Sequence, residues 1–350
     1  MLLFLKCGAK VIGYFEICNI FAKKISKMDK IIGLGNALTD VLAIVKSDEI
    51  LADLKLQKGC ITFVNDEGLL KMNRLLASMQ ARKVPGGSAG NSIRAMARLN
   101  VPVGFIGKVG MDDNGAFYRE SLSACGVDTH LLVSADLPSG VASTFISPDG
   151  ERTFADYLGA ASSLKAEELM PDMFKGYTYL LIEGYLVQDH DMILRAIELA
   201  KEAGLQVCMD LASPNVVRDD RDFFSLLINK YVDIVFANEE EARAFTGKEP
   251  EEALDVLGGL CSVAVVKLGA RGSLLRKGTE TVHVEAVAVE KVVDTTGAGD
   301  YFAAGFLYGL TCGYALEKCA RIGSLLSGHI IQVIGAELSP EEWKTIKNEL

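Results

Sequence analysis

The chain has 350 residues, of which 49% are hydrophobic and 23% are charged, and its formal net charge is −10. This is the composition of a globular protein with ample apolar material for a large core. An acidic chain is a poor partner for nucleic acids, whose phosphates it repels, although it can still bind phosphate groups at a few aimed amides.

Eight cysteines are scattered along the chain without a C-x-x-C pair, and the four histidines lack the spacing of metal ligands. Most of the cysteines lie in apolar runs, and we interpret them as small buried hydrophobic residues. This pattern favours a reducing cytoplasm over a secreted disulfide framework, and it predicts no structural zinc site.

The first 27 residues are apolar and basic, but Lys6 and Lys10 interrupt them. No apolar run there approaches the roughly 20 residues that span a bilayer, and no A-x-A-like cleavage site follows. Met28 then opens a stretch that resembles an ordinary protein start. We therefore expect residues 1–28 to be a dispensable extension or an over-extended reading frame, with a targeting segment as the alternative.

From Asp29 onward, short apolar runs alternate with helical patterns. The runs have the β-branched composition of buried strands, and one helical pattern ends at Gly204, a typical C-terminal cap. Such alternation predicts a single α/β domain over residues 29–350, with a parallel sheet covered by helices on both faces. The expected strands are 30–35, 103–106, 179–182, 207–210, 234–237 and 263–267, and the expected helices include 91–99, 114–125 and 191–203.

Two stretches, about residues 38–64 and 130–157, break this rhythm because they have strand-like patterns and turn signals but little helix. Ser147-Pro-Asp-Gly150 lies between the strand-like segments 141–146 and 151–155, and it is a hairpin signal. We expect these segments to form a small β lid over the main domain. Such a lid can close over its own site or pair with the lid of a second subunit.

The sequence Asp294-Thr-Thr-Gly-Ala-Gly-Asp300 directly precedes a helical pattern. At a helix N-terminus the free amides of Gly297, Ala298 and Gly299 can converge on an anion, and small residues allow its close approach. The carboxylate of Asp300 would repel a phosphate beside this anion hole. We therefore interpret Asp300 as the base that takes a proton from an attacking hydroxyl, with an ordinary helix cap as the alternative.

A second motif, Pro85-Gly-Gly-Ser-Ala-Gly-Asn91, also opens a helical pattern. Its paired glycines permit a tight turn, and Ser88 and Asn91 supply hydrogen bonds that suit hydroxyl groups. On its own, this motif is more typical of a helix-capping loop.

A third motif, Gly33-Leu-Gly35-Asn36-Ala-Leu38, follows the first expected strand. It resembles a dinucleotide fingerprint, but Leu38 stands where the third glycine belongs, which disfavours a dehydrogenase. Asp40 is placed to accept hydrogen bonds from a vicinal diol, with a solvated turn aspartate as the alternative. The chain has no G-x-x-x-x-G-K-[ST] sequence and no H-R-D or D-F-G set, which excludes P-loop NTPases and protein kinases.

The order of the motifs is more specific than any one of them. A Gly-Gly motif early, an N-x-x-E sequence at Asn238–Glu241 and a D-T-x-G-A-G-D sequence late resemble the ribokinase (PfkB) family of small-molecule kinases, over about residues 29–349. The resemblance implies a ribokinase-like three-layer α/β/α sandwich with a mostly parallel central sheet and a small β lid. It also implies ATP-dependent phosphorylation of a hydroxyl group.

The resemblance further implies a role for each motif. Asp300 would be the catalytic base, and Gly297, Ala298 and Gly299 would form the anion hole for the transferring phosphoryl group. Glu241 would organise Mg²⁺ through water. The implied binding residues are Asn36, Asp40, Gly87, Ser88 and Asn91 for the acceptor, Asn238, Lys267, Gly269 and Gly272 for ATP, and Asp294 and Thr296, near Gly335, for a monovalent cation such as K⁺.

Within that family the chain most resembles the adenosine-kinase branch. Residues 150–153 and 157–162 resemble the return of its lid, and Tyr185 stands where that branch stacks a base, with a core aromatic as the alternative. Residues 210–215 depart from the D-P-N-x-R sequence of many sugar kinases. We therefore expect a purine nucleoside such as adenosine as the acceptor. A free sugar (ribose, fructose or 2-keto-3-deoxygluconate) and a non-catalytic nucleotide- or sugar-binding module are the alternatives.

Overall fold

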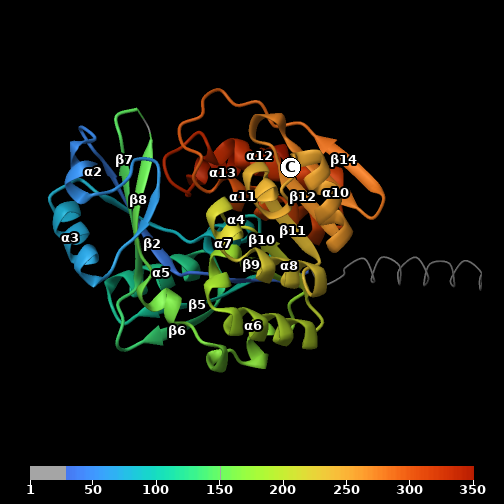
Figure 1. Ribbon diagram of the computed structural model, residues 1–350, viewed down its shortest axis with the longest axis horizontal. Coiled ribbons are helices and arrows are strands. Elements are labelled where there is room, and N and C mark those ends of the chain that lie inside the picture. The colour runs from blue at the N-terminus through green and yellow to red at the C-terminus, as the bar shows by residue number, and fades with distance from the viewer. Residues whose placement is uncertain (1–28, 150) are drawn as a thin grey trace, which may run out of the picture.

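The computed structural model describes residues 29–149 and 151–350, so the expected extension at residues 1–28 lies outside the described residues. The described chain forms two sheets, one of nine strands and one of five. Figure 1 shows the smaller sheet at one side of the molecule, with the helices α2 and α3 on its outer side. No helix among these residues is long and apolar enough to cross a membrane.

The larger sheet has the strand order β14-β13-β12-β11-β10-β9-β1-β5-β6. It is parallel from β6 to β12, and only β13 and β14 run antiparallel to their neighbours. This confirms the prediction of an α/β fold with a mostly parallel central sheet. The strands are β1 (Ile31–Leu34), β5 (Val103–Gly110), β6 (Asp128–Ser134), β9 (Tyr179–Glu183), β10 (Gln206–Asp210), β11 (Ile234–Asn238), β12 (Val263–Lys267), β13 (Ser273–Lys277) and β14 (Glu280–Val284).

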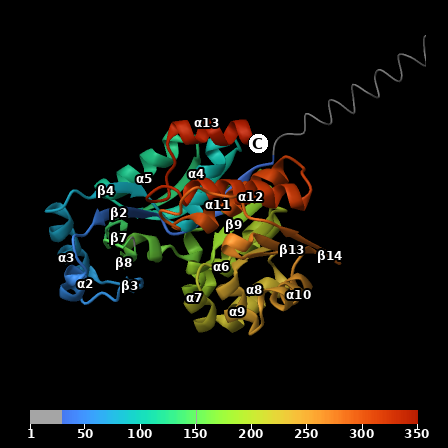
Figure 2. The ribbon, with the colours of Figure 1, turned by 90° about the horizontal axis from the view of Figure 1, so that it is seen from above.

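Both faces of this sheet are buried, which explains why its strands are apolar throughout instead of alternating with polar residues. Neighbouring residues of one strand enter opposite cores: Ile31 and Leu181 belong to one hydrophobic cluster, whereas Ile32 and Leu180 belong to the other. Figure 2 shows the helices in two layers, one on each side of the sheet. One layer holds α4 (Ser88–Arg98), α5 (Asp113–Ala124), α11 (Ala298–Thr311), α12 (Leu316–Ile330) and α13 (Pro340–Glu349), and the other holds α6 (His190–Glu202), α7 (Pro214–Asp219), α8 (Arg221–Lys230), α9 (Glu239–Thr246) and α10 (Pro250–Leu260).

The smaller sheet, here called the lid sheet, has the strand order β3-β8-β7-β2-β4. Its outer face packs on α2 (Glu49–Leu54) and α3 (Asp66–Ala77) around a separate small core that includes Phe145 and Ala155. Its strands are β2 (Leu38–Ile44), β3 (Ile61–Phe63), β4 (Arg82–Pro85), β7 (Gly140–Ile146) and β8 (Arg152–Tyr157). Strands β7 and β8 pair antiparallel, with Ile146 opposite Arg152, as a hairpin requires.

The lid sheet differs from the expected lid at three points. Residues 128–134 form β6, which pairs with β5 in the larger sheet, so the second lid segment starts later than residue 130. Residues 82–85 add β4, which pairs with β2 although the sequence gives them no clear strand pattern. The segment 38–64, expected to have little helix, contains α2, and α3 follows it at Asp66, because a sheet with one exposed apolar face needs a covering layer.

Candidate active site

The candidate site lies where the strand order of the larger sheet reverses. From β1 the chain builds outward to β5 and β6, and it then returns to β9 on the other side of β1. The crevice beyond the carboxyl ends of the strands at such a point is where open α/β sheets bind their ligands. Asn36 follows β1 and Glu183 ends β9, and the amide N and Nδ2 of Asn36 both donate to Glu183 Oε1, at 2.8 and 2.7 Å.

Glu183 is a site residue to which the sequence analysis gives no role. Its second oxygen, Oε2, accepts a hydrogen bond from the amide of Ala89 at 2.9 Å, and burial raises its pKa to about 7. The carboxyl group therefore ties the ends of β1 and β9 to the start of α4. Asn36 was expected to bind the acceptor, but its side-chain amide donates to Glu183 at this junction and the residue is only 5% exposed. The available signal in the sequence is a glutamate at the end of an otherwise apolar strand.

Asp300 lies in the first turn of α11 and faces the first turns of α4. Ser88 Oγ donates to Asp300 Oδ1 at 2.6 Å, and Asn91 Nδ2 donates to Asp300 Oδ2 at 2.8 Å. Ser92 Oγ donates to the main-chain oxygen of the same residue at 2.9 Å. The Gly-Gly motif and the D-T-x-G-A-G-D motif, about 200 residues apart, thus meet at the carboxyl group of Asp300. Ser88 and Asn91, which were expected to bind the acceptor, donate their hydrogen bonds to the expected base.

The electrostatic surroundings of Asp300 suit a general base. Burial raises its pKa to about 6, while the hydrogen bonds from Ser88 and Asn91 lower it, and the neighbouring carboxylate of Asp210 raises it further. A carboxyl group with a pKa just below neutral is deprotonated at pH 7 and is a stronger base than an exposed aspartate. Asp300 is therefore able to accept a proton from a hydroxyl held beside it.

Gly86 and Gly87 allow the lid sheet and α4 to meet closely. A β-carbon on Gly86 would lie 2.0 Å from Oδ1 of Asp40, and one on Gly87 would lie 2.1 Å from the carbonyl oxygen of Asn36. Gly87 also has a φ of 78°, in the region that favours glycine. The two glycines therefore bring the Asp40 carboxyl group next to the loop that carries Ser88.

Asp40 lies on β2, on the inner face of the lid sheet. Burial raises its pKa to about 7, Arg94 lowers it, and the charge of Asp300 raises it. Asp40 is therefore close enough to feel the charge of Asp300, although one residue lies in the lid sheet and the other at the start of α11. The sequence prediction that Asp40 belongs with the Gly-Gly motif agrees with this geometry.

The N-terminus of α11 presents the small residues of the predicted anion hole. Gly297 begins the helix with a φ of 77°. The amide of Ala298 donates to the carbonyl of Thr295 at 3.2 Å, whereas those of Gly297 and Gly299 have no hydrogen-bond partner within the described chain. Among the described residues, two of the three expected amides are thus free to bind an anion, which the helix dipole would favour.

Lys267 ends β12 and reaches the same helix start. Its Nζ lies 2.8 Å from Oδ2 of Asp210 and 3.0 Å from the position that a β-carbon on Gly299 would take. Burial lowers the pKa of Lys267, but the carboxylates of Asp210 and Glu241 outweigh this effect and hold the pKa above its usual value. The ammonium group therefore stays charged beside the anion hole, where a phosphate would meet it.

The glycine loop after Lys267 is a short turn between β12 and β13. Gly269 and Gly272 have φ values of 57° and 87°, and the amide of Leu268 donates to the carbonyl of Gly272 at 2.7 Å. A β-carbon on Gly272 would lie 2.0 Å from the carbonyl oxygen of Val284, so only glycine fits there. Gly269 and Gly272 thus shape the loop by backbone conformation and present no side chain to a ligand.

Asn238 and Glu241, the predicted N-x-x-E pair, build the start of α9. Both oxygens of Glu241 accept hydrogen bonds from Asn238, and the amide of Glu241 donates back to Asn238 Oδ1 at 2.8 Å. Such a capping box satisfies the free amides of a helix start. Glu241 is nonetheless only 3% exposed, and burial together with Asp210 raises its pKa to about 7. A helix cap does not require a carboxyl group that is buried and lies near a second carboxylate, so Glu241 is a candidate for a further role.

The carboxyl groups of Asp210 and Glu241 fit a Mg²⁺ ion whose other ligands are waters and substrate phosphates. Both lie near Lys267, on the side of the crevice that holds the predicted anion hole, here called the phosphate side. Among the described residues, no three acidic, histidine or cysteine side chains gather into a metal cluster. Mg²⁺ in phosphoryl-transfer sites is typically bound by one or two carboxylates, several waters and the substrate phosphates. The donor set here agrees with that pattern.

Asp294 and Thr296, the implied ligands of a monovalent cation, are brought together but already have a cationic partner. Arg152, on β8 of the lid sheet, donates from Nη1 to Thr296 Oγ1 at 2.8 Å. Its Nη2 forms an ion pair with Asp294 Oδ2, out of line for a hydrogen bond. The residues present therefore do not fit the expected cation while Arg152 stays in place.

Known proteins resemble this chain over most of its length. Residues 60–343 match the model of the pfkB family carbohydrate kinases. The chain is 33% identical to an adenosine kinase from Sinorhizobium meliloti (TM-score 0.83; 92% of this chain, 100% of that one) and 32% identical to a probable sugar kinase from Rhizobium etli (TM-score 0.84; 92% and 98%). It is also 26% identical to adenosine kinase 2 from Arabidopsis thaliana, covering 87% of this chain and 94% of the relative.

The chain belongs to the PfkB family. The predicted resemblance, including its closeness to the adenosine-kinase branch, is thereby confirmed. Kinases of this family are ATP-dependent phosphotransferases that act on hydroxyl groups of sugars or nucleosides, and this chain is such an enzyme.

In this kinase, Tyr185 lies on the short helix Gly184–Gln188 that follows β9. Its hydroxyl contacts the carbonyl oxygen of Ala212 at 3.4 Å, and its ring is partly buried. The carboxylates of Glu241 and Asp300 both raise the pKa of its hydroxyl, so Tyr185 lies near the candidate site. Stacking of a base on its ring stays a prediction.

Three residues of β8 line the inner face of the lid sheet without a role having been predicted for them. On β8, Ala155 and Tyr157 turn outward to the lid helices, so Arg152, Phe154 and Asp156 share the inner face, following the two-residue period of a strand. Asp156 lies two strands from Asp40 in the same register, and burial raises its pKa to about 8, with a contribution from Asp40. The alternation along β8 is the signal from which these residues could have been found.

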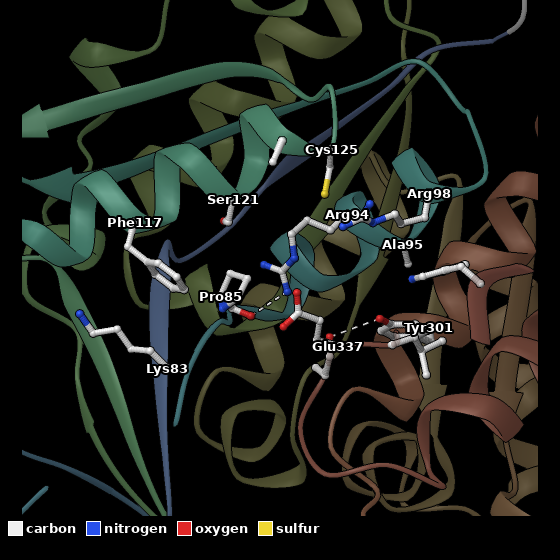
Figure 3. Close-up of a pocket in the computed structure, with 14 residues that line it drawn as sticks. Lys83, Pro85, Arg94, Ala95, Arg98, Phe117, Ser121, Cys125, Tyr301 and Glu337 are labelled. Atoms are coloured by element: carbon white, nitrogen blue, oxygen red, sulfur yellow. Dashed lines mark hydrogen bonds between the residues drawn. The ribbon is translucent and has the colours of Figure 1, made fainter. Parts of the chain in front are cut away.

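A hollow of about 200 Å³ lies behind the site, between β4, α4, α5 and α13 (Figure 3). Arg94 lines it and donates from Nη2 to the carbonyl of Pro85 at 2.7 Å and to Asn91 Oδ1 at 2.6 Å. Arg94 thereby orients the Asn91 amide so that its NH₂ group faces Asp300. The hollow itself also has Arg98, Phe117 and Tyr301 on its walls.

Proposed function

We propose that the kinase transfers the γ-phosphoryl group of ATP to the hydroxymethyl group of a purine nucleoside, with adenosine as the leading acceptor. The observation that carries the proposal is the placement of Asp40 beside Asp300. A carboxylate that can accept two hydrogen bonds from a diol adjoins the base that would deprotonate a nearby hydroxyl. A ribose ring has this arrangement of a diol and a hydroxymethyl group.

The aromatic side chains support a base on that ribose. Tyr185 adjoins the crevice from the main domain, and Phe154 lies on the inner face of the lid sheet. Stacking of a nucleobase on an aromatic ring contributes about 1–3 kcal/mol in proteins that bind single-stranded nucleic acids. The relatives named adenosine kinase, which this chain resembles over most of its length, support the same acceptor.

In the proposed reaction, Asp300 accepts the proton of the acceptor hydroxyl as its oxygen bonds to the γ-phosphorus. The bond from that phosphorus to the oxygen bridging to the β-phosphate breaks, and ADP leaves with the electron pair. The amides of Gly297 and Gly299, with the ammonium group of Lys267, would bind the charge on the transferring group. No covalent intermediate with the protein is required.

Glu241, Asn238 and Asp210 would hold Mg²⁺ through its bound waters on the phosphate side. Mg²⁺, when bound with ATP, offsets the negative charge of the triphosphate. The protein contributes fixed carboxyl groups there, since the capping box holds Glu241 in one orientation. Gly269 and Gly272 shape the loop that would lie along the nucleotide.

A substrate panel with coupled ADP detection tests the acceptor. Adenosine, inosine, ribose, fructose and 2-keto-3-deoxygluconate are compared at equal ATP and Mg²⁺. We expect the highest kcat/KM with adenosine or another purine nucleoside. A higher value with fructose or 2-keto-3-deoxygluconate would show that the acceptor is a free sugar, which is the second candidate because one similar structure is a probable sugar kinase.

We further propose a homodimer formed through the lid and a cytoplasmic location. Strand β3 is an edge of the lid sheet, and its Ile61 and Phe63 are exposed. An unpaired edge with apolar side chains is a common site of strand pairing between subunits. Sedimentation velocity of the wild type and of Phe63→Lys tests the dimer.

The cysteines support the proposed cytoplasmic location. The six cysteines of the described residues are free thiols, as is usual in a reducing compartment.

A further inference from the structure

Arg152 joins the lid sheet to the loop that precedes the anion hole. It begins β8, and its guanidinium contacts both Thr296 and Asp294. The side chains of Arg152 and Asp294 are only 9% and 2% exposed, so the ion pair is buried. Two residues separate Asp294 from Gly297, the N-cap of α11. The lid therefore reaches the phosphate side of the site through a single buried charge pair.

The carboxyl group of Asp294 is nearly saturated by its partners. The amide of Thr296 donates to Oδ1 at 3.0 Å, and the amide of Gly335 donates to Oδ2 at 2.7 Å. A carboxylate offers about four lone-pair sites. The two amides occupy two of them, and the guanidinium of Arg152 lies against Oδ2 as an ion pair. Asp294 consequently holds together the anion-hole loop, the loop before α13 and the lid.

A monovalent cation at Asp294 would compete with this guanidinium. Arginine remains charged at every working pH, so the pair of Arg152 and Asp294 is neutral as it stands. A K⁺ ion added there would put two positive charges against the one buried carboxyl group of Asp294, which is unfavourable. K⁺ also needs oxygen ligands, and Arg152 engages the hydroxyl of Thr296 that the cation would approach.

We propose that Arg152 supplies at Asp294 the positive charge that a monovalent cation would otherwise supply, and that this kinase turns over independently of the monovalent cation. Arg152 is then a positioning residue that fixes the anion-hole loop through Thr296 and Asp294. Because the guanidinium comes from the lid sheet, this fixation depends on the lid being in place. The inference rests on the phosphotransferase activity of the family and not on the identity of the acceptor.

The first test uses the wild-type protein in chloride salts of K⁺, Na⁺ and tetramethylammonium at equal ionic strength. We expect kcat and the KM for ATP to agree within about twofold among the three salts. The melting temperature without nucleotide should also be the same, since a ligand that binds only the folded state would raise it. A K⁺-specific rise in the melting temperature, or a K⁺-specific gain of about fivefold or more in kcat, overturns the proposal.

The second test removes the guanidinium. For Arg152→Ala we expect kcat to fall by about 10²-fold in tetramethylammonium, with K⁺ or added methylguanidinium restoring part of it and raising the melting temperature. Lys58→Ala is the matched control, because Lys58 bridges Asp48 and Asp149 within the lid without touching the anion-hole loop. It should behave like the wild type in every salt.

The outcomes separate the possible failures. An Arg152→Ala variant with wild-type kcat in all three salts shows that Arg152 does not position the loop. If this variant does not fold, Arg152→Lys keeps the charge without the two-pronged contact, and the wild-type salt series still decides the cation question. If no acceptor of the panel is phosphorylated, the proposed function fails, while the melting temperatures in the three salts continue to test the cation site.

Discussion

The phosphate side and the lid side of this site are built in different ways. On the phosphate side, the site residues come from contiguous motifs. Residues 294–300 supply the small residues and the base within seven positions, and Asn238–Glu241 form one helix start. On the lid side, Asp40, Arg152 and Asp156 come from β2 and β8, which are more than 100 residues apart and meet only through the pairing of both with β7.

This difference follows from what each half must recognise. Phosphate groups are alike in every reaction of the family, and backbone amides at a helix start bind them whatever the neighbouring sequence. Acceptor hydroxyls and rings differ between substrates, so they are met by side chains on strands whose alternation places every second residue in the site. Changes on the phosphate side should therefore lower kcat, whereas changes on the lid side should act mainly on the acceptor. Arg152 is the exception on the lid, because it contacts Thr296 and Asp294 of the anion-hole loop.

The largest effect is expected on the phosphate side, from Asp300→Asn. Asparagine caps helices well, so the fold should persist, but it cannot accept the proton of the acceptor hydroxyl. Loss of general-base assistance typically costs about 10²–10⁴ in rate. We expect kcat to fall by that factor with the KM for ATP nearly unchanged, measured at saturating acceptor. Near-wild-type turnover would assign Asp300 to capping alone and remove the base from the mechanism.

The same contrast explains which parts of the molecule could be predicted from the sequence. The parallel sheet was predictable because apolar strands such as 234–237 have no polar face, and Asp300 was predictable because its motif is contiguous. Glu183 was not, since its role arises from a strand end meeting Asn36 across 147 positions. The pairing of Arg152 with Asp294 was not either, because both residues have other plausible roles and only the fold brings them together.

On the lid side, Asp40→Asn should raise the KM for the acceptor more than it lowers kcat. The amide keeps the size of the side chain but accepts fewer and weaker hydrogen bonds than a carboxylate, and a charged hydrogen bond is worth about 1.5–3 kcal/mol. We expect kcat/KM for the acceptor to fall by about 10- to 100-fold, with the KM for ATP unchanged. Asp48→Asn, at an exposed position of the same lid, is the control and should leave both constants unchanged. An equal loss in the KM for ATP would contradict the division between the two sides.

A smaller effect is expected from Glu241→Gln, again on the phosphate side. Glutamine retains an oxygen that can accept from Asn238, so α9 should still be capped, but the charge that orients the waters of Mg²⁺ is lost. Substituting a residue that orients a metal's direct ligands typically lowers the metal affinity by about 10-fold or more. We therefore expect the Mg²⁺ concentration at half-maximal rate to rise about tenfold. Activity should vanish in EDTA and return with Mg²⁺ in both proteins. Superimposable Mg²⁺ titrations would remove Glu241 from the site.

The smallest and most specific effect is the pH dependence of the base. Burial raises the pKa of Asp300 to about 6, so its basic form is lost as the pH falls through that value, and kcat/KM for the acceptor should be roughly halved at pH 6 relative to its plateau. The hydrogen bond from Ser88 lowers this pKa, so Ser88→Ala should move the acid limb to higher pH. Ser92→Ala is a matched control, because Ser92 donates to the main-chain oxygen of Asp300 and not to its carboxyl group. The carboxyl group of Asp40, with a pKa of about 7, also titrates in this range, but the comparison of the two serine variants cancels its contribution. If both variants shift the limb equally, the pH profile reports a group other than Asp300, and the assignment of the base would then rest on Asp300→Asn alone.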